Sequence, residues 1–126
     1  MTSTDVRRYS ARARSTETFG RVLCSARTQH FVVDGPVQNG CPGEALSPAE
    51  LFLAGVATCG VELVQVIAKE HNVPVQAVSA TIEASQDRSQ PARPDVSLFN
   101  RVRLEFNLKG VTQEQGAQLI ETFKRR

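Results

Sequence analysis

Cys59 is the residue of this sequence whose surroundings are best suited to chemistry. Small and apolar residues precede it over 51–57, and Gly55 and Gly60 lie close to it. Each glycine lowers the stability of a helix interior by about 1 kcal/mol relative to alanine, so its presence needs an explanation. Either a second backbone packs against the helix there, or the glycine leaves room for a small substrate. Cys59 is therefore a candidate nucleophile, and the competing interpretation is a small, buried apolar side chain.

A nucleophilic cysteine needs a nearby positive charge that stabilises its thiolate. Cys59 lies about 16 Å from the start of the expected helix, too far for the positive end of the helix dipole to act on it. An arginine from the N-terminal strands or loops must supply the charge. Arg14, Arg21 and Arg27 are the candidates, and the sequence does not rank them.

Glu50 is the candidate acidic partner. It precedes Cys59 by nine residues, about 2.5 helical turns, which puts it on roughly the opposite side of the helix. Glu50 also closes the segment SPAE, 47–50, where its carboxylate can accept a hydrogen bond from the backbone amide of the capping serine. Capping is a sufficient explanation for this glutamate, and a catalytic role is the second one.

The remaining cysteines and histidines predict no metal site and no cofactor. Cys24 takes an inward position of an expected strand, whereas Cys41 lies in a loop, either without a role or able to swing toward Cys59. His30 and His71 are isolated, and the sequence has no CxxC pair or Cys/His cluster. Three unpaired cysteines are typical of reduced thiols, so we expect a cytoplasmic protein.

Length and composition narrow the class of protein. A chain of 126 residues predicts a single domain over 1–126, and 40% hydrophobic with 22% charged residues is typical of a globular protein. A net charge of +2, one tyrosine and no tryptophan argue against a nucleic-acid partner. The apolar run 51–68 is interrupted by Glu62 and Gln65, which predicts a buried helix rather than a membrane partner.

Alternation of apolar and polar residues predicts an α+β layer fold. Strands are expected over 9–13, 21–26, 30–33, 78–85 and 101–108, with a hairpin turn over 27–29. A long helix should run from Pro48 to about His71, and a closing helix should begin with a second capping box over 112–115. Because the long helix is apolar or small on every side from Leu51 to Gly60, we expect that part to be enclosed all round. The closing helix should turn Leu119, Ile120 and Phe123 inward.

The segment 47–59, SPAELFLAGVATC, resembles the helix motif of the OsmC/Ohr family, the osmotically inducible and organic-hydroperoxide-resistance proteins. The segment 31–36, FVVDGP, and the Gly-rich loop after it resemble the general OsmC-like branch, and the resemblance covers roughly 19–126. It implies an OsmC-like fold, in which an antiparallel sheet accompanies a long buried central helix that carries the cysteine. It also implies an intertwined homodimer whose two central helices pack together.

The same resemblance implies a thiol-dependent peroxidase that reduces organic hydroperoxides in oxidative stress defence. Cys59 would be the peroxidatic cysteine, a small apolar hydroperoxide the substrate, and an external thiol or dithiol the reductant. The alternative is a non-catalytic OsmC-like protein that binds a small apolar ligand at the dimer cleft, with the cysteine structural.

This sequence departs from the family pattern in three ways. Ala49 stands where catalytic members have a glutamate, and Glu50 in the next position points about 100° away. No arginine matches the activating arginine by its spacing. The chain ends at Arg126 about where the family's resolving cysteine would follow. Either the chain is truncated there, which we favour, or this member lacks a resolving thiol.

Overall fold

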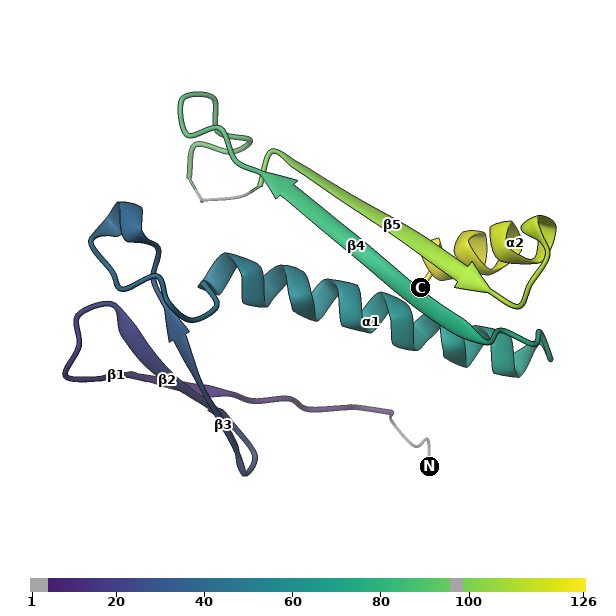
Figure 1. Cartoon of the computed structure of the whole chain (residues 1–126), viewed down its shortest axis with the longest axis horizontal. Coiled ribbons are helices and arrows are strands. Elements are labelled where there is room, and N and C mark those ends of the chain that lie inside the picture. The colour runs from purple at the N-terminus through teal and green to yellow at the C-terminus, as the bar shows by residue number, and fades with distance from the viewer. Residues whose placement is uncertain (1–4, 96–98) are drawn as a thin grey trace. The chain divides into compact units, whose positions relative to one another are not determined.

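The computed structural model describes residues 5–95 and 99–126. Its elements follow one another in the order β1 (Arg12–Ser15), β2 (Arg21–Ala26), β3 (Gln29–Asp34), η1 (Val37–Asn39), α1 (Pro48–Glu70), β4 (Ala77–Ser85), β5 (Arg101–Lys109) and α2 (Gln113–Lys124) (Figure 1). The strands pair antiparallel, which confirms the predicted α+β class. The chain divides into two compact units, Met1–Leu51 and Phe52–Arg126, with α1 beginning in the first and continuing in the second.

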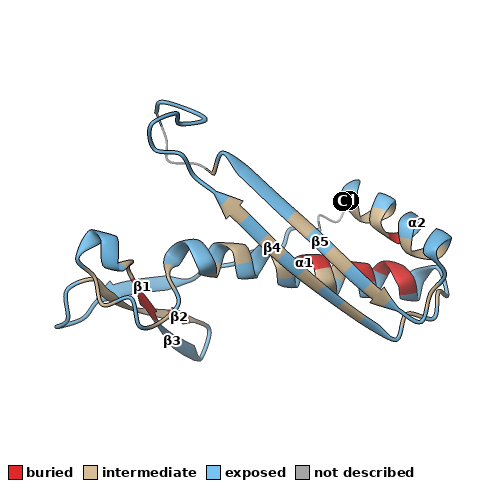
Figure 2. Ribbon diagram, turned by 45° about the horizontal axis from the view of Figure 1, so that its top comes forward, coloured by how far each residue is buried: buried red, intermediate tan, exposed pale blue. Residues whose placement is uncertain are grey.

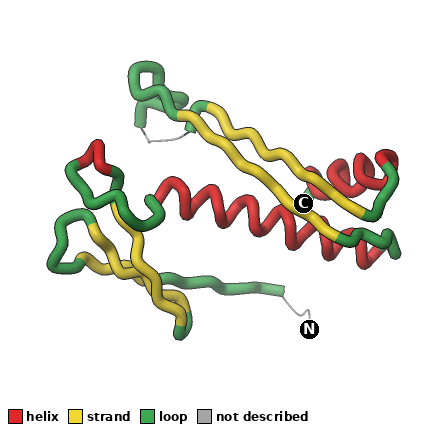
Figure 3. The backbone as a smooth tube through the Cα atoms, viewed as in Figure 1, coloured by secondary structure: helices red, strands yellow, loops and turns green. Residues whose placement is uncertain are grey.

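The first unit contains a three-stranded sheet in the order β1-β2-β3 (Figure 3). The predicted hairpin is confirmed, with Ala26 paired to Gln29 and Arg27 in the left-handed region at φ 54°. The first strand lies at Arg12–Ser15 rather than over 9–13. Pairing with β2 fixes its position, with Arg12 opposite Ser25 and Ser15 opposite Val22.

A buried carboxylate ties this sheet to the segment before α1. Asp34 is 0% exposed, and Arg21 donates to its two oxygens from Nε at 2.8 Å and Nη2 at 3.0 Å. The backbone N–H groups of Glu44 and Ala45 donate to Oδ2 at 3.0 and 2.9 Å, and the N–H of Asp34 donates to the carbonyl of Leu46 at 2.9 Å. The Arg21 guanidinium, together with these amides, holds the pKa of Asp34 well below its usual range.

Asp34→Asn should lower the melting temperature at pH 7, because the variant loses the ion pair and keeps a buried polar group. The folded-state pKa of Asp34 is depressed, so its stabilisation is present above its unfolded pKa of about 3.9 and is lost as the pH falls below that value. The difference from wild type, measured by thermal unfolding, should therefore shrink below about pH 4. Asp95→Asn, which breaks an exposed pair with Arg93, is the control and should change little. A difference independent of pH would contradict the prediction.

The second unit packs α1 and α2 with the two-stranded sheet β4-β5. Apolar residues of the two strands pair across the sheet, Val78 with Leu108, Ala80 with Phe106 and Ile82 with Leu104. Its buried cluster is formed by Val64, Ile67, Ala68 and Leu119, with Phe106, Leu108, Ile120, Phe123 and others packed against it. Figure 2 shows the buried positions of α1 and α2 in red. The predicted inner face of α2 is thereby confirmed. The alternating apolar positions of β4 and β5 are half-buried, except Val102, which was expected to face inward and is 51% exposed.

Both helices begin with the predicted capping boxes. At α1, Glu50 N–H donates to Ser47 Oγ at 3.2 Å, and Ser47 N–H donates to Glu50 Oε1 at 3.0 Å. Thr112 and Gln115 make the same reciprocal pair at α2, at 3.1 and 3.0 Å. Asn72, in the left-handed region at φ 55°, follows the end of α1.

The N-terminal half of α1 is not enclosed within one chain, contrary to the sequence-based expectation. The buried residues of α1 are Gly60, Val64, Ile67 and Ala68, all in its C-terminal half. Phe52 remains 62% exposed and Val56 38%. With a mean hydropathy of 1.9, α1 is long and apolar enough to cross a membrane by length and composition alone, a test that the core helix of a soluble protein also passes.

Candidate functional site

Cys59 lies at the centre of an exposed apolar surface on α1. Residues three, four and seven positions away lie on the same side of a helix. We call the apolar members of this set, together with Cys59, the apolar stripe: Phe52, Val56, Cys59, Leu63 and Val66. Leu63 is half-buried and the other four are exposed. Gly55 and the exposed, charged Glu62 lie on the same side of the helix. Within one chain the thiol therefore reaches solvent beside apolar neighbours and Glu62, so the competing interpretation of a buried Cys59 does not hold within the single chain. Burial of this part of α1 in a homodimer stays a prediction.

An aromatic pair, not anticipated from the sequence, lies at the N-terminal end of the stripe. The ring of Phe52 contacts that of Phe99, with centroids 6.2 Å apart and planes tilted by 40°. Phe99 precedes β5, so this contact brings the start of that strand next to the first turns of α1. A single phenylalanine in a polar loop gives no signal from which this pairing could be predicted.

Glu50 has the capping role that the sequence predicts. The backbone N–H and the hydroxyl of Ser47 lower the pKa of the Glu50 carboxyl, so it is a stable anion at the helix start. Both members of the capping box belong to the first unit, whereas Cys59 belongs to the second. A catalytic role for Glu50 stays a prediction.

The three candidate arginines all lie in the first unit. Arg21 is held by Asp34 and by Glu44, whose Oε1 accepts from Nη2 at 3.0 Å, and these carboxylates raise its pKa further. Arg14 is exposed on β1, and Arg27 is exposed in the β2–β3 turn.

The other two cysteines have structural surroundings. Cys24 is half-buried on β2. Cys41 is also half-buried, and its side chain lies so close to the backbones of Gly20 and Gly35 that a Cβ at either glycine would overlap its Sγ. His30 Nδ1 lies 2.7 Å from the hydroxyl of Ser25, which is its partner on β2. In the part of the chain that the structure describes, no three metal-ligating side chains gather.

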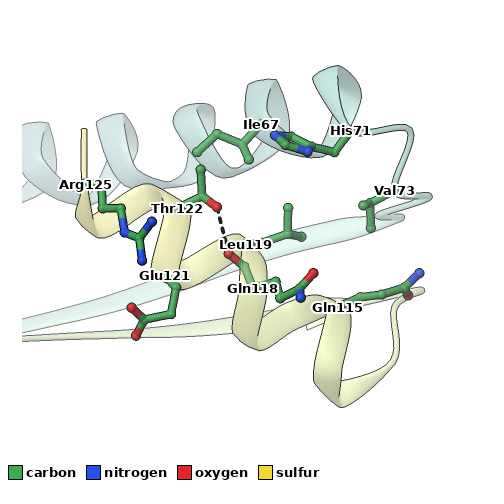
Figure 4. A pocket seen from close by; sticks show the side chains of 9 residues that line it. All are labelled: Ile67, His71, Val73, Gln115, Gln118, Leu119, Glu121, Thr122 and Arg125. Atoms are coloured by element: carbon green, nitrogen blue, oxygen red, sulfur yellow. Dashed lines mark hydrogen bonds between the residues drawn. The ribbon is translucent and has the colours of Figure 1, made fainter.

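A pocket of about 300 Å³ lies between the C-terminal end of α1 and α2, away from Cys59. Figure 4 shows Ile67 and His71 on one side and residues of α2 such as Leu119 and Thr122 on the other. Thr122 Oγ1 donates to the carbonyl of Gln118 at 3.0 Å. Since the thiol does not line this pocket, the candidate site is the apolar stripe.

Comparisons with known proteins identify the family of this chain. The family model described as OsmC-like protein matches residues 41–126. A comparison with curated proteins gives no match.

Three solved structures share the fold. An OsmC-like protein from Mycoplasma pneumoniae is 14% identical with a TM-score of 0.81, covering 98% of this chain and 84% of its own. An organic hydroperoxide resistance protein OsmC from Legionella pneumophila is 24% identical with a TM-score of 0.70 and covers 95% and 84%. An organic hydroperoxide resistance protein from Elizabethkingia anophelis, solved with thiocyanate bound, is 21% identical with a TM-score of 0.71 and covers 98% and 85%.

Proposed function

The chain belongs to the OsmC family, and from that premise we propose that it is a thiol-dependent peroxidase that reduces organic hydroperoxides through Cys59. One observation carries the proposal, the exposed thiol of Cys59 in the middle of the apolar stripe. Apolar neighbours favour a hydroperoxide with an alkyl or aryl group over hydrogen peroxide, because burying that group against them is favourable. The names of the Legionella and Elizabethkingia proteins support the substrate class.

The reaction proceeds in two stages. The thiolate attacks the distal peroxide oxygen, the O–O bond breaks, and the alkoxide leaves with the electron pair and takes up a proton, giving an alcohol and a sulfenic acid on Cys59. An external thiol then attacks the sulfenic sulfur, releasing water and forming a mixed disulfide. A second external thiol reduces that disulfide and regenerates the Cys59 thiol.

The proposal includes a homodimer in the cytoplasm. The exposed apolar stripe on α1 needs a cover in water, and a second copy of the same helix offers a surface of the same chemistry. Cys24, Cys41 and Cys59 are all free thiols, which suits a reducing compartment.

A non-catalytic protein that binds a small apolar ligand is the second candidate. Two observations favour it. Glu50 is engaged in the helix cap, and no charged side chain among the described residues of the second unit bonds to Cys59. In that case Cys59 would react with peroxides no faster than a free thiol.

The test is the reaction of the reduced protein with cumene hydroperoxide, tert-butyl hydroperoxide and hydrogen peroxide, followed by intact mass with a sulfenic-acid trap. Rapid addition of one oxygen or of the trap at Cys59, faster with the organic peroxides, is the expected result. Oxidation at the rate of free cysteine would reject the peroxidase and leave the ligand-binding protein.

A further inference from the structure

Gly60 is the point at which α1 enters the core of the second unit. It is buried, whereas its neighbour Cys59 is exposed. Val64, Ile67 and Ala68 continue the buried side toward the C-terminus. The peptide bond between residues 59 and 60 therefore joins the candidate nucleophile directly to the first fully packed position of the helix.

Two aromatic rings converge on the bare backbone of Gly60. A Cβ placed there would lie 2.9 Å from Cζ of Phe106, 3.3 Å from its Cε1 and 3.5 Å from Cζ of Phe123. The two rings support each other edge to face, with centroids 5.2 Å apart and planes at 74°. Phe106 comes from β5 and Phe123 from α2, so three elements meet at this one glycine.

The geometry points to Gly60 as a positioning residue for Cys59, with the Phe106–Phe123 pair as the support that sets how deep this turn of α1 lies. This inference rests on the proposed peroxidase function. Ordinary carbon contacts begin near 3.4 Å, so a methyl group at residue 60 has about 0.5 Å too little room beneath it. Phe123 packs against the same ring, which limits how far Phe106 can retreat, so the helical turn takes up part of the strain and Cys59 moves with it.

A displacement of this size matters for attack on a peroxide, which requires the sulfur to be in line with the O–O bond. Misplacement by 1 Å can cost about a hundredfold in rate, so a shift of half that size should cost about tenfold. Simple alkylation of a fully ionised thiol depends mainly on access and should hardly change.

The test compares single-turnover oxidation of Cys59 by cumene hydroperoxide in four proteins: wild type, Gly60→Ala, Gly60→Ala/Phe106→Leu and Gly116→Ala. Gly60→Ala should be slower by about tenfold, and the double variant should regain most of that loss because leucine lacks the ring atoms that face residue 60. Gly116→Ala is the matched control in α2, where a Cβ meets only Val111 at 3.7 Å, and should react like wild type. Iodoacetamide alkylation at high pH should proceed equally in all four.

Each outcome of this test supports or overturns the positioning role of Gly60. A folded Gly60→Ala protein oxidised at the wild-type rate would overturn the positioning role, as would a double variant as slow as the single one. If Gly60→Ala does not fold, Phe106→Leu is compared with the double variant instead. The double variant should then react faster than Phe106→Leu, because the methyl group at residue 60 fills the space that the smaller leucine leaves. A wild type no faster than free cysteine would instead reject the peroxidase function itself, and the positioning role with it.

Discussion

Cys59→Ser should remove peroxidase activity while leaving the fold intact. A serine hydroxyl is not ionised near neutral pH and does not accept oxygen from a peroxide, so the rate should fall on the order of a thousandfold, to the background of ordinary thiols. Because Cys59 is exposed, the substitution should change the free energy of unfolding by less than about 0.5 kcal/mol. Steady-state turnover of cumene hydroperoxide with dithiothreitol as reductant measures the first effect, and thermal unfolding the second.

Cys24→Ser is the matched control for this experiment. It replaces sulfur by oxygen, as Cys59→Ser does, but at a half-buried strand position in the first unit where no peroxide chemistry is proposed. It should keep wild-type turnover and should still gain one oxygen on Cys59. Unchanged turnover in Cys59→Ser, or equal losses in the two variants, would place the chemistry elsewhere and leave Cys59 as a structural thiol.

The features predicted correctly from the sequence are those that depend on near neighbours. The capping boxes of Ser47 and Thr112 involve residues three positions apart, and the hairpin turn at Arg27 joins adjacent strands. Alternation along Ala77–Ser85 likewise predicts which side chains of that strand face the core. Each of these requires only the local chain and the period of its element.

Contacts between distant segments explain what the sequence did not reveal. Cys41 packs against Gly20 and Gly35, so this contact joins three separate segments. The Phe52–Phe99 pair joins a helix to a loop. Gly60 was expected to face either a second backbone or a small substrate, whereas within the chain it faces an aromatic ring of β5. Periodicity shows that a position is apolar and does not show what covers it.

The exposed half of α1 leads to the second large prediction, that Val56→Asp abolishes the proposed homodimer. Val56 is 38% exposed, and Gly55 beside it has no atom within 4 Å of where a Cβ would lie, so this surface has room for an approaching helix. An aspartate would place one unpaired carboxylate on each copy at a symmetric interface. A desolvated, unpaired charge costs several kcal/mol, and each tenfold change in affinity corresponds to about 1.4 kcal/mol. The dissociation constant of the dimer should therefore rise by at least about a hundredfold.

Sedimentation velocity over a range of concentrations measures this change. Gln65→Asp is the control, because it places the same charge on the same helix but about 120° around from Cys59, at an exposed polar position. Wild type and Gln65→Asp should sediment as dimers and Val56→Asp as a folded monomer. A wild type that is monomeric and stable at micromolar concentration would contradict the homodimer.

A wild type that partitions into membranes would instead make a lipid bilayer the cover of the stripe. Because Cys59 lies on the same side of α1 as Val56, any cover must leave the thiol a path to its peroxide, so the Val56→Asp monomer should also show whether the second copy assists catalysis or only shields the helix from water.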